Sequence, residues 1–114
     1  MRSLVKGFKA LSDTNRIRIL KMLEVRPLCV CEITAVLGLA TSTVSKHLSI
    51  LRDAGYIFDQ KENKWVNYYL NRTSQAQYVK EILPLLEKWL PDNHTIMKDR
   101  DRVMVVNREE LCRI

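Results

Sequence analysis

Two cysteines separated by one residue are the side chains of this sequence best suited to chemistry. Cys29 and Cys31 stand in the segment Leu28-Cys29-Val30-Cys31-Glu32, and thiolates are soft ligands that prefer soft or borderline ions. Cys31 lies where we expect a helix to begin, and the amides of a helix N-terminus favour a thiolate. The alternative interpretation is that both cysteines are small buried hydrophobic residues.

The spacing of these thiols sets a geometric condition on joint ligation. Residues i and i+2 of a regular helix point about 200° apart, whereas they point the same way in an extended segment. A single ion held by Cys29 and Cys31 therefore requires the first turn of the expected helix to be non-helical or to unwind. We expect thiol ligation to distort residues 28–33 and to move the helix that follows.

Cys112 is the third cysteine of the chain. It either completes the site, from the same chain or from a partner subunit, or is an inert residue of the tail. A site of three thiolates and a site of two thiolates completed by solvent or a small thiol are the two possible arrangements. An odd number of cysteines fits poorly with a secreted disulfide framework, so we expect a cytoplasmic protein.

Apolar spacing predicts the helices that must position the thiols. It indicates a short helix near residues 4–11 and a second helix that is capped by Ser12 or Asp13 and ends before Pro27. A third helix should end at Gly38, and a fourth, over residues 42–53, should be capped by a hydroxyl of residues 41–43. Two short helices joined by roughly four residues are typical of a helix-turn-helix.

The period of the pattern then changes to that of strands. Residues 56–60 and 65–70 are rich in aromatic and β-branched types, which predicts a β-hairpin with Asn63 at a positive φ in its turn. A hairpin after a helix-turn-helix is a wing, so the expected fold is mainly α with a β-hairpin wing. A last helix is expected over residues 76–90, with a kink or break at Pro84. The tail, 91–114, shows no clear periodicity.

The fourth helix carries short hydroxyl and basic side chains away from its apolar stripe. Hydroxyls bond to phosphates and base edges, and Lys and Arg neutralise phosphate. The second helix of such a motif enters the major groove with its N-terminal residues on the bases. The expected DNA contacts are Ser42, Thr43, Ser45, Lys46, His47 and Arg52 on the helix, with Lys61 and Lys64 at the wing tip. The alternatives are a solvated polar face and an ordinary charged turn.

The charge of the chain agrees with a nucleic-acid partner. The 114 residues carry a formal charge of +6, and residues 1–75 hold the whole excess, with 12 Lys and Arg against 6 Asp and Glu. A basic balance favours phosphates or anionic lipid. No apolar run approaches the roughly 20 residues that span a bilayer, so no membrane partner is expected.

The chain is expected to have two parts. Residues 1–90 should form a DNA-binding and dimerisation domain. Residues 91–114 should form a tail, which contributes a thiol to the site if Cys112 is a ligand.

These motifs resemble the ArsR/SmtB family. The resemblance rests on Leu11-Ser12-Asp13 followed by Arg16, on the run 41–57 and on Trp65-Val66-Asn67-Tyr68-Tyr69-Leu70, and it covers residues 4–90. It implies a winged-helix repressor that leaves DNA when it binds metal or metalloid. The segment 29–32 is similar to the metal box of the arsenic- and cadmium/lead-sensing branches, which implies As(III) or Sb(III) as inducer, or else Cd(II) or Pb(II).

The resemblance also implies a homodimer that reads an inverted repeat of double-stranded operator DNA. The first and last helices carry more apolar surface than one small winged helix covers, unless they only complete a monomeric core. The residues expected at the interface are Leu4, Val5, Phe8, Val79, Ile82, Leu86 and Trp89.

An enzyme is not expected, because the sequence has no Cys-x-x-Cys, Gly-rich loop or clustered acid/base pair. A closer rival is a redox-sensing repressor on the same fold, in which Cys29 and Cys31 oxidise.

Overall fold

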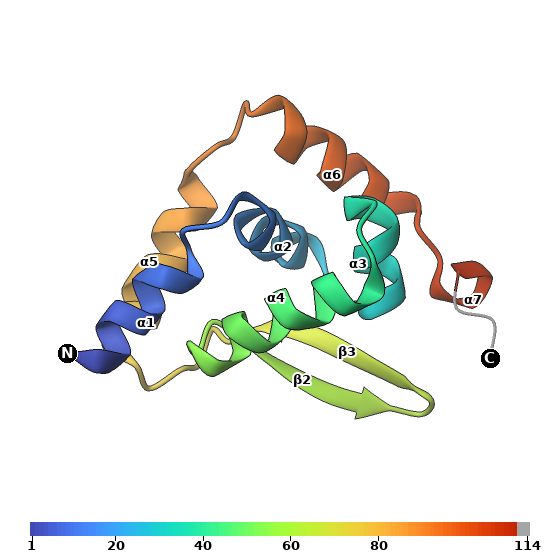
Figure 1. Ribbon diagram of the computed structural model, residues 1–114. Coiled ribbons are helices and arrows are strands. Elements are labelled where there is room, and N and C mark those ends of the chain that lie inside the picture. Colours follow the sequence, from blue (N-terminus) through green and yellow to red (C-terminus); the bar gives the residue numbers. More distant parts are fainter. Residues whose placement is uncertain (112–114) are drawn as a thin grey trace.

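The computed structural model describes residues 1–111 (Figure 1). The first half of the chain contains four helices and a short strand: α1 (Arg2–Ala10), α2 (Thr14–Val25), β1 (Leu28–Cys29), α3 (Val30–Leu37) and α4 (Thr41–Asp53). The second half contains two strands and three helices: β2 (Ile57–Glu62), β3 (Trp65–Leu70), α5 (Gln77–Lys88), α6 (His94–Val105) and α7 (Arg108–Leu111). No helix within residues 1–111 is long and apolar enough to cross a membrane.

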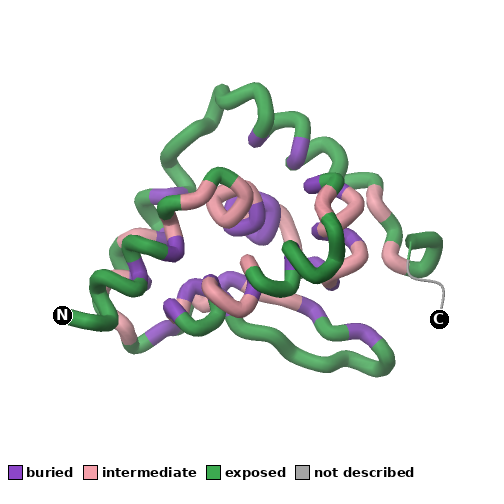
Figure 2. Tube along the Cα trace, in the orientation of Figure 1, coloured by how far each residue is buried: buried purple, intermediate pink, exposed green. Residues whose placement is uncertain are grey.

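Helix α2 lies at the centre of the molecule, with the other helices around it (Figures 1 and 2). Its side chains Ile19 and Leu20 are fully buried. Asp13 caps the helix, as predicted: its carboxylate accepts hydrogen bonds from the backbone amides of Asn15 and Arg16, at 2.8 and 3.1 Å. The cap fixes where α2 begins, and the apolar residues behind it form the core on which the other helices pack.

Helices α3 and α4 form the predicted helix-turn-helix. Gly38 ends α3 in the left-handed region at φ 71°, which a residue without a Cβ adopts freely. The expected hydroxyl cap of α4 is wrong, because Ala40 is the N-cap residue and no side chain caps the helix. The amide of Val44 already bonds to the carbonyl of Ala40, so the three hydroxyl residues lie inside the first turn.

The predicted wing is present, and it carries a strand that the sequence did not reveal. Strands β2 and β3 are antiparallel, with Glu62 opposite Trp65 and Asn63 at φ 58° in the turn. Strand β1 pairs with the other edge of β3 and places Cys29 opposite Asn67, so the strand order is β1-β3-β2. Two residues are too few to show a period of two. This pairing attaches the thiol segment directly to the wing.

Helix α5 runs through Pro84 without a break, so of the expected kink or break the break is wrong. Proline removes one backbone hydrogen bond, but buried side chains on both sides of it, Leu83 and Leu86, hold the helix against the core. At the other end of the helix Tyr78 packs on α1. A Cβ on Gly7 would lie 2.4 Å from the ring carbon Cε2 of Tyr78, so α1 approaches α5 closely there.

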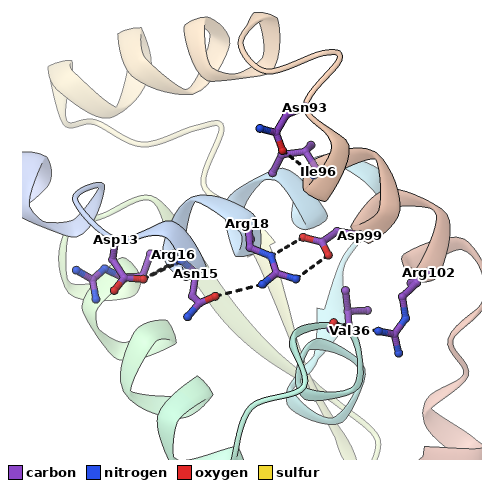
Figure 3. Close-up of polar contacts among 9 residues, drawn as sticks. All are labelled: Asp13, Asn15, Arg16, Arg18, Val36, Asn93, Ile96, Asp99 and Arg102. Carbon is purple, nitrogen blue, oxygen red and sulfur yellow. Dashed lines mark hydrogen bonds and ion pairs between the residues drawn. The ribbon is translucent and has the colours of Figure 1, made fainter.

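Residues 94–105, for which the sequence showed no periodicity, form helix α6 across α2 and α3. Asp99 is buried, and its two oxygens each accept a 2.8 Å hydrogen bond from the guanidinium of Arg18 on α2 (Figure 3). Arg102 donates to the carbonyls of Ala35 and Val36 near the end of α3. The alternating charges of α6 mask its short apolar stripe in the sequence, so no helical period was visible. The bidentate ion pair of Asp99 with Arg18 positions the helix on α2. Cys112 lies outside the described residues.

We expect Asp99→Ala to lower the free energy of unfolding by about 2–3 kcal/mol, because the partly buried guanidinium of Arg18 loses its partner. Urea denaturation at fixed protein concentration measures the change. Asp101→Ala is the matched control, since Asp101 is an exposed carboxylate on the same helix. It should change the stability by less than about 0.5 kcal/mol, and equal effects of the two variants would contradict a stabilising ion pair.

Candidate thiol site and nucleic-acid interface

Cys29 ends strand β1 and is also the N-cap residue of α3. The sequence predicts that the helix begins at Cys31, but β1 stays extended through Cys29 and Val30 already has helical geometry. The side chain of Cys29 is only 4% exposed. Burial raises the pKa of the Cys29 thiol, and the nearby amide of Glu32 only partly opposes this effect. Helix-end stabilisation therefore does not make Cys29 a ready thiolate.

The carboxylate of Glu32 links the thiol segment to two helices. One oxygen accepts a hydrogen bond from the backbone amide of Cys29 at 3.0 Å, and the other lies 3.0 Å from Nη2 of Arg26. The same guanidinium nitrogen donates to the carbonyls of Val103 and Val106, at 3.0 and 3.1 Å. Because Glu32 is buried, its charge has to keep these partners. The start of α3, the end of α2 and the end of α6 are thereby held together.

Cys31 is half-buried in the first turn of α3, and its carbonyl accepts a hydrogen bond from the hydroxyl of Thr34. Cys29 has extended backbone angles, φ −91° and ψ 170°, whereas Cys31 is helical. Joint ligation requires both cysteines to lie in an extended segment, and only Cys29 does so here. Within residues 1–111, no group of three His, Cys, Asp or Glu side chains is arranged to hold a metal ion.

The thiol segment is also connected to the wing. Asn67, opposite Cys29 in the sheet, is buried, and its side-chain oxygen accepts a 2.9 Å hydrogen bond from Arg108 of α7. The guanidinium of Arg108 lies 4.9 Å from the ring centroid of Trp65, at the distance of a cation–π contact. A change in the backbone at Cys29 therefore acts on β3 as well as on α3.

Helix α4 presents the polar face that the sequence predicted. Its apolar side buries Val44, Leu48 and Leu51. The opposite side exposes four of the expected DNA contacts, Ser42, Thr43, Ser45 and Lys46. His47 is different, because it is half-buried and its Nδ1 lies 3.1 Å from Nη1 of Arg16 on α2.

The wing lies beside α4 (Figure 1). Arg52 is exposed near the end of α4, with Nη1 3.4 Å from a carboxylate oxygen of Asp59 on β2, so it joins the two elements. Lys61 and Lys64 are exposed at the wing tip, and Nζ of Lys64 lies 5.2 Å from the ring centroid of Trp65. The predicted DNA contacts thus gather on α4 and the adjoining hairpin.

The apolar residues expected at a dimer interface differ in how deeply they are buried. Three residues of α1, Leu4, Val5 and Phe8, are exposed, and so is Trp89, which ends α5. Ile82 is half-buried. Val79 and Leu86 instead lie in the core of the protomer, because the inner side of α5 packs on it. Leu85 and Leu90, which were not expected, add to the exposed apolar surface.

Four charged residues that matter here were not singled out as site residues by the sequence: Arg16, Arg26, Glu32 and Arg108. Glu32 alone had a local signal, since Cys29-x-x-Glu32 has the spacing of a capping box. The three arginines have partners up to 80 positions away in the chain, for which no local pattern exists.

Known proteins resemble this chain along most of its length. Residues 13–58 match the model of the bacterial regulatory protein arsR family. The arsenic resistance transcriptional regulator ArsR2 of Pseudomonas putida is 34% identical over 110 residues, which are 92% of this chain and 93% of that protein. A cadmium resistance transcriptional regulatory protein CadC homolog of Staphylococcus aureus is 37% identical over 68% of this chain and 65% of its own length.

Solved structures share the fold. Reduced HlyU from Vibrio cholerae has a TM-score of 0.65 at 33% identity, over 79% of this chain and 90% of that one. The homodimeric winged helix-turn-helix DNA-binding domain of a possible ArsR-family regulator from Mycobacterium bovis also has a TM-score of 0.65, at 22% identity, over 76% of this chain and 77% of its own. With the helix-turn-helix and wing described above, these similarities show that the chain belongs to the ArsR family of bacterial regulatory proteins.

Proposed function

We propose that this chain is a dimeric repressor that binds operator DNA and is released when As(III) or Sb(III) binds Cys29 and Cys31. The observation that carries the proposal is the position of the thiol pair, at a junction bonded both to the helix-turn-helix and to the wing. Relatives named as arsenic resistance regulators support this choice of ion. A cadmium resistance relative makes Cd(II) or Pb(II) the second candidate.

Cys29 and Cys31 are the residues that would hold the ion, as thiolates. Because Cys31 stands in a helical turn and Cys29 in a strand, joint ligation requires residues 30–32 to leave the helix. The carboxylate of Glu32 would then lose its hydrogen bond from the amide of Cys29 and its contact with Arg26. A displaced α3 carries the turn at Gly38 and hence α4, which is how the thiols would reach the DNA-reading face.

On DNA, α4 would enter the major groove with its N-terminal residues on base edges, and the wing tip would meet phosphates. A two-fold dimer built on α1 and α5 would present two such helices to the two halves of an inverted repeat. The exposed apolar residues of α1 and α5 support this assembly, because patches of this kind mark interaction sites.

We expect Phe8→Asp to convert the dimer to a monomer and to weaken DNA binding at least about tenfold, because a charge enters the apolar interface and only one half-site is held. Phe8 is 56% exposed in the protomer, so the substitution leaves the core intact. Analytical ultracentrifugation measures the assembly. Met104→Asp is the matched control, since Met104 is an exposed apolar residue of α6. A wild-type monomer at micromolar concentration would contradict the dimer.

We expect Cys29→Ser and Cys31→Ser each to retain DNA binding and to lose release by As(III), because a hydroxyl is a poor ligand for a thiophilic ion. The measurement is fluorescence anisotropy of a duplex of about 30 base pairs, selected from a random pool by the wild-type protein, under reducing conditions. Cys112→Ser tests the third thiol in the same assay.

Parallel titrations with Sb(III), Cd(II), Pb(II) and peroxide identify the effector. Release by peroxide alone would favour a redox sensor, and normal release of both Cys29→Ser and Cys31→Ser would rule out the thiol site.

We expect Glu32→Gln to lower the As(III) concentration for half-release about tenfold, since the first turn of α3 loses its ion pair with Arg26 and unwinds at lower cost. The anisotropy titration described for the cysteine variants measures this. Glu109→Gln, an exposed carboxylate of α7, is the control. An unchanged midpoint for Glu32→Gln would show that this carboxylate does not oppose release.

A further inference from the structure

Arg16 joins three helices through its guanidinium group. Nε donates to the carbonyl of Ala10 at 2.7 Å, and Nη2 donates to the carbonyl of Lys9 at 3.2 Å, so two of its nitrogens hold the end of α1. The remaining nitrogen, Nη1, lies 3.1 Å from Nδ1 of His47 on α4. Arg16 therefore acts as a joint between the helix expected to dimerise and the helix expected to read DNA, and each of its three nitrogens has a partner.

This contact determines which nitrogen of the His47 ring carries the proton. A guanidinium group has donors and no acceptor, so Nδ1 of His47 has to accept and the proton has to reside on Nε2. A second proton on Nδ1 would break the hydrogen bond and place two cations in contact. The carboxylate of Asp13 interacts with His47, and it also accepts hydrogen bonds from the amides of Asn15 and Arg16.

We infer that Arg16 is a positioning residue that holds His47 as a neutral donor, and that Nε2–H of His47 binds a backbone phosphate of operator DNA. The inference rests on the proposed function and adds to it a defined contact. His47 lies on the same side of α4 as the buried residues Val44 and Leu51, not at the centre of the exposed face. A side chain on the flank of a helix in the major groove meets the phosphate walls, whereas the central side chains meet base edges.

A neutral donor leaves a signature that a charged one does not. Each phosphate neutralised by a cation contributes about −0.9 to the slope of log K against log[salt], because counterions are released, and a neutral hydrogen bond contributes nothing. We therefore expect His47→Ala to weaken binding about 3- to 10-fold at pH 7.5 with an unchanged slope. Lys46→Ala is the matched control on the neighbouring position, and it should reduce the slope by about 0.9.

Two further substitutions test the identity of the donor nitrogen. The amide nitrogen of glutamine lies near the position of Nε2, and that of asparagine near Nδ1. His47→Gln should therefore bind DNA within about twofold of the wild type, while His47→Asn should match His47→Ala. Arg16→Lys loses the contact that orients Nδ1 of His47, so it should weaken binding about as much as His47→Ala. Thermal melting of each variant establishes that it is folded. If Arg16→Lys does not fold, the His47 variants alone decide which ring nitrogen donates to DNA.

The outcomes separate this inference from the proposed function. The probe is the duplex selected by the wild-type protein, with single base-pair substitutions along it. A slope reduced by about 0.9 in His47→Ala would show a charged histidine and overturn the inference. A loss of affinity that disappears when one particular base pair is changed would show a contact to a base edge, which also overturns it. Failure of the wild-type protein to bind any selected duplex would instead overturn the repressor function.

Discussion

A buried carboxylate has to keep its partners, and the geometry around the thiol pair depends on this constraint at Glu32. Its partners are the amide of Cys29 and the guanidinium of Arg26, and that guanidinium also binds carbonyls at the end of α6. A rearrangement of Cys29 therefore does not stay local, because it removes one of the two partners of the buried Glu32 carboxylate. The pairing of β1 with β3 adds the wing to the same connected unit.

Helix α2 is the frame that connects this unit to the DNA-reading face. Three of its cationic side chains bind other elements: Arg16 contacts α1 and His47, Arg18 binds α6, and Lys21 binds carbonyls at the end of α5. Arg26, directly after the helix, binds Glu32. These charges count towards the basic excess of residues 1–75, yet they serve as internal joints. The exposed cations expected to meet DNA are instead Lys46 and Arg52 on α4 and Lys61 and Lys64 at the wing tip.

The C-terminal helices give the thiol junction a second set of contacts. Helix α6 is fixed to α2 by the bidentate pair of Asp99 with Arg18, and it reaches the end of α3 through Arg102. Arg108 of α7 reaches the wing at Asn67 and Trp65. The segment after α5 is thus packed on α2, α3 and the wing.

The sequence by itself determined the features that arise from neighbours in the chain. Helical and strand periods, the cap at Asp13, the left-handed Gly38 and the hairpin at Asn63 each depend on a few consecutive residues, and all are present in the structure. The polar face of α4 and the spacing of the two thiols were also visible, since the period of a helix is known in advance. Helix α6 escaped detection because its charges mask a narrow apolar stripe.

Only the tertiary structure decided which residues of distant segments contact one another. Strand β1 exists because β3 offers an edge to residues too few to form a strand alone, and the helix begins at Val30 instead of Cys31. Val79 and Leu86, two of the expected interface residues, proved to be core because packing, which periodicity does not specify, chooses the inner side of α5. The contact of Arg16 with His47 joins residues 31 positions apart. Long-range pairs of this kind follow from how helices pack in space, and local sequence carries no record of them.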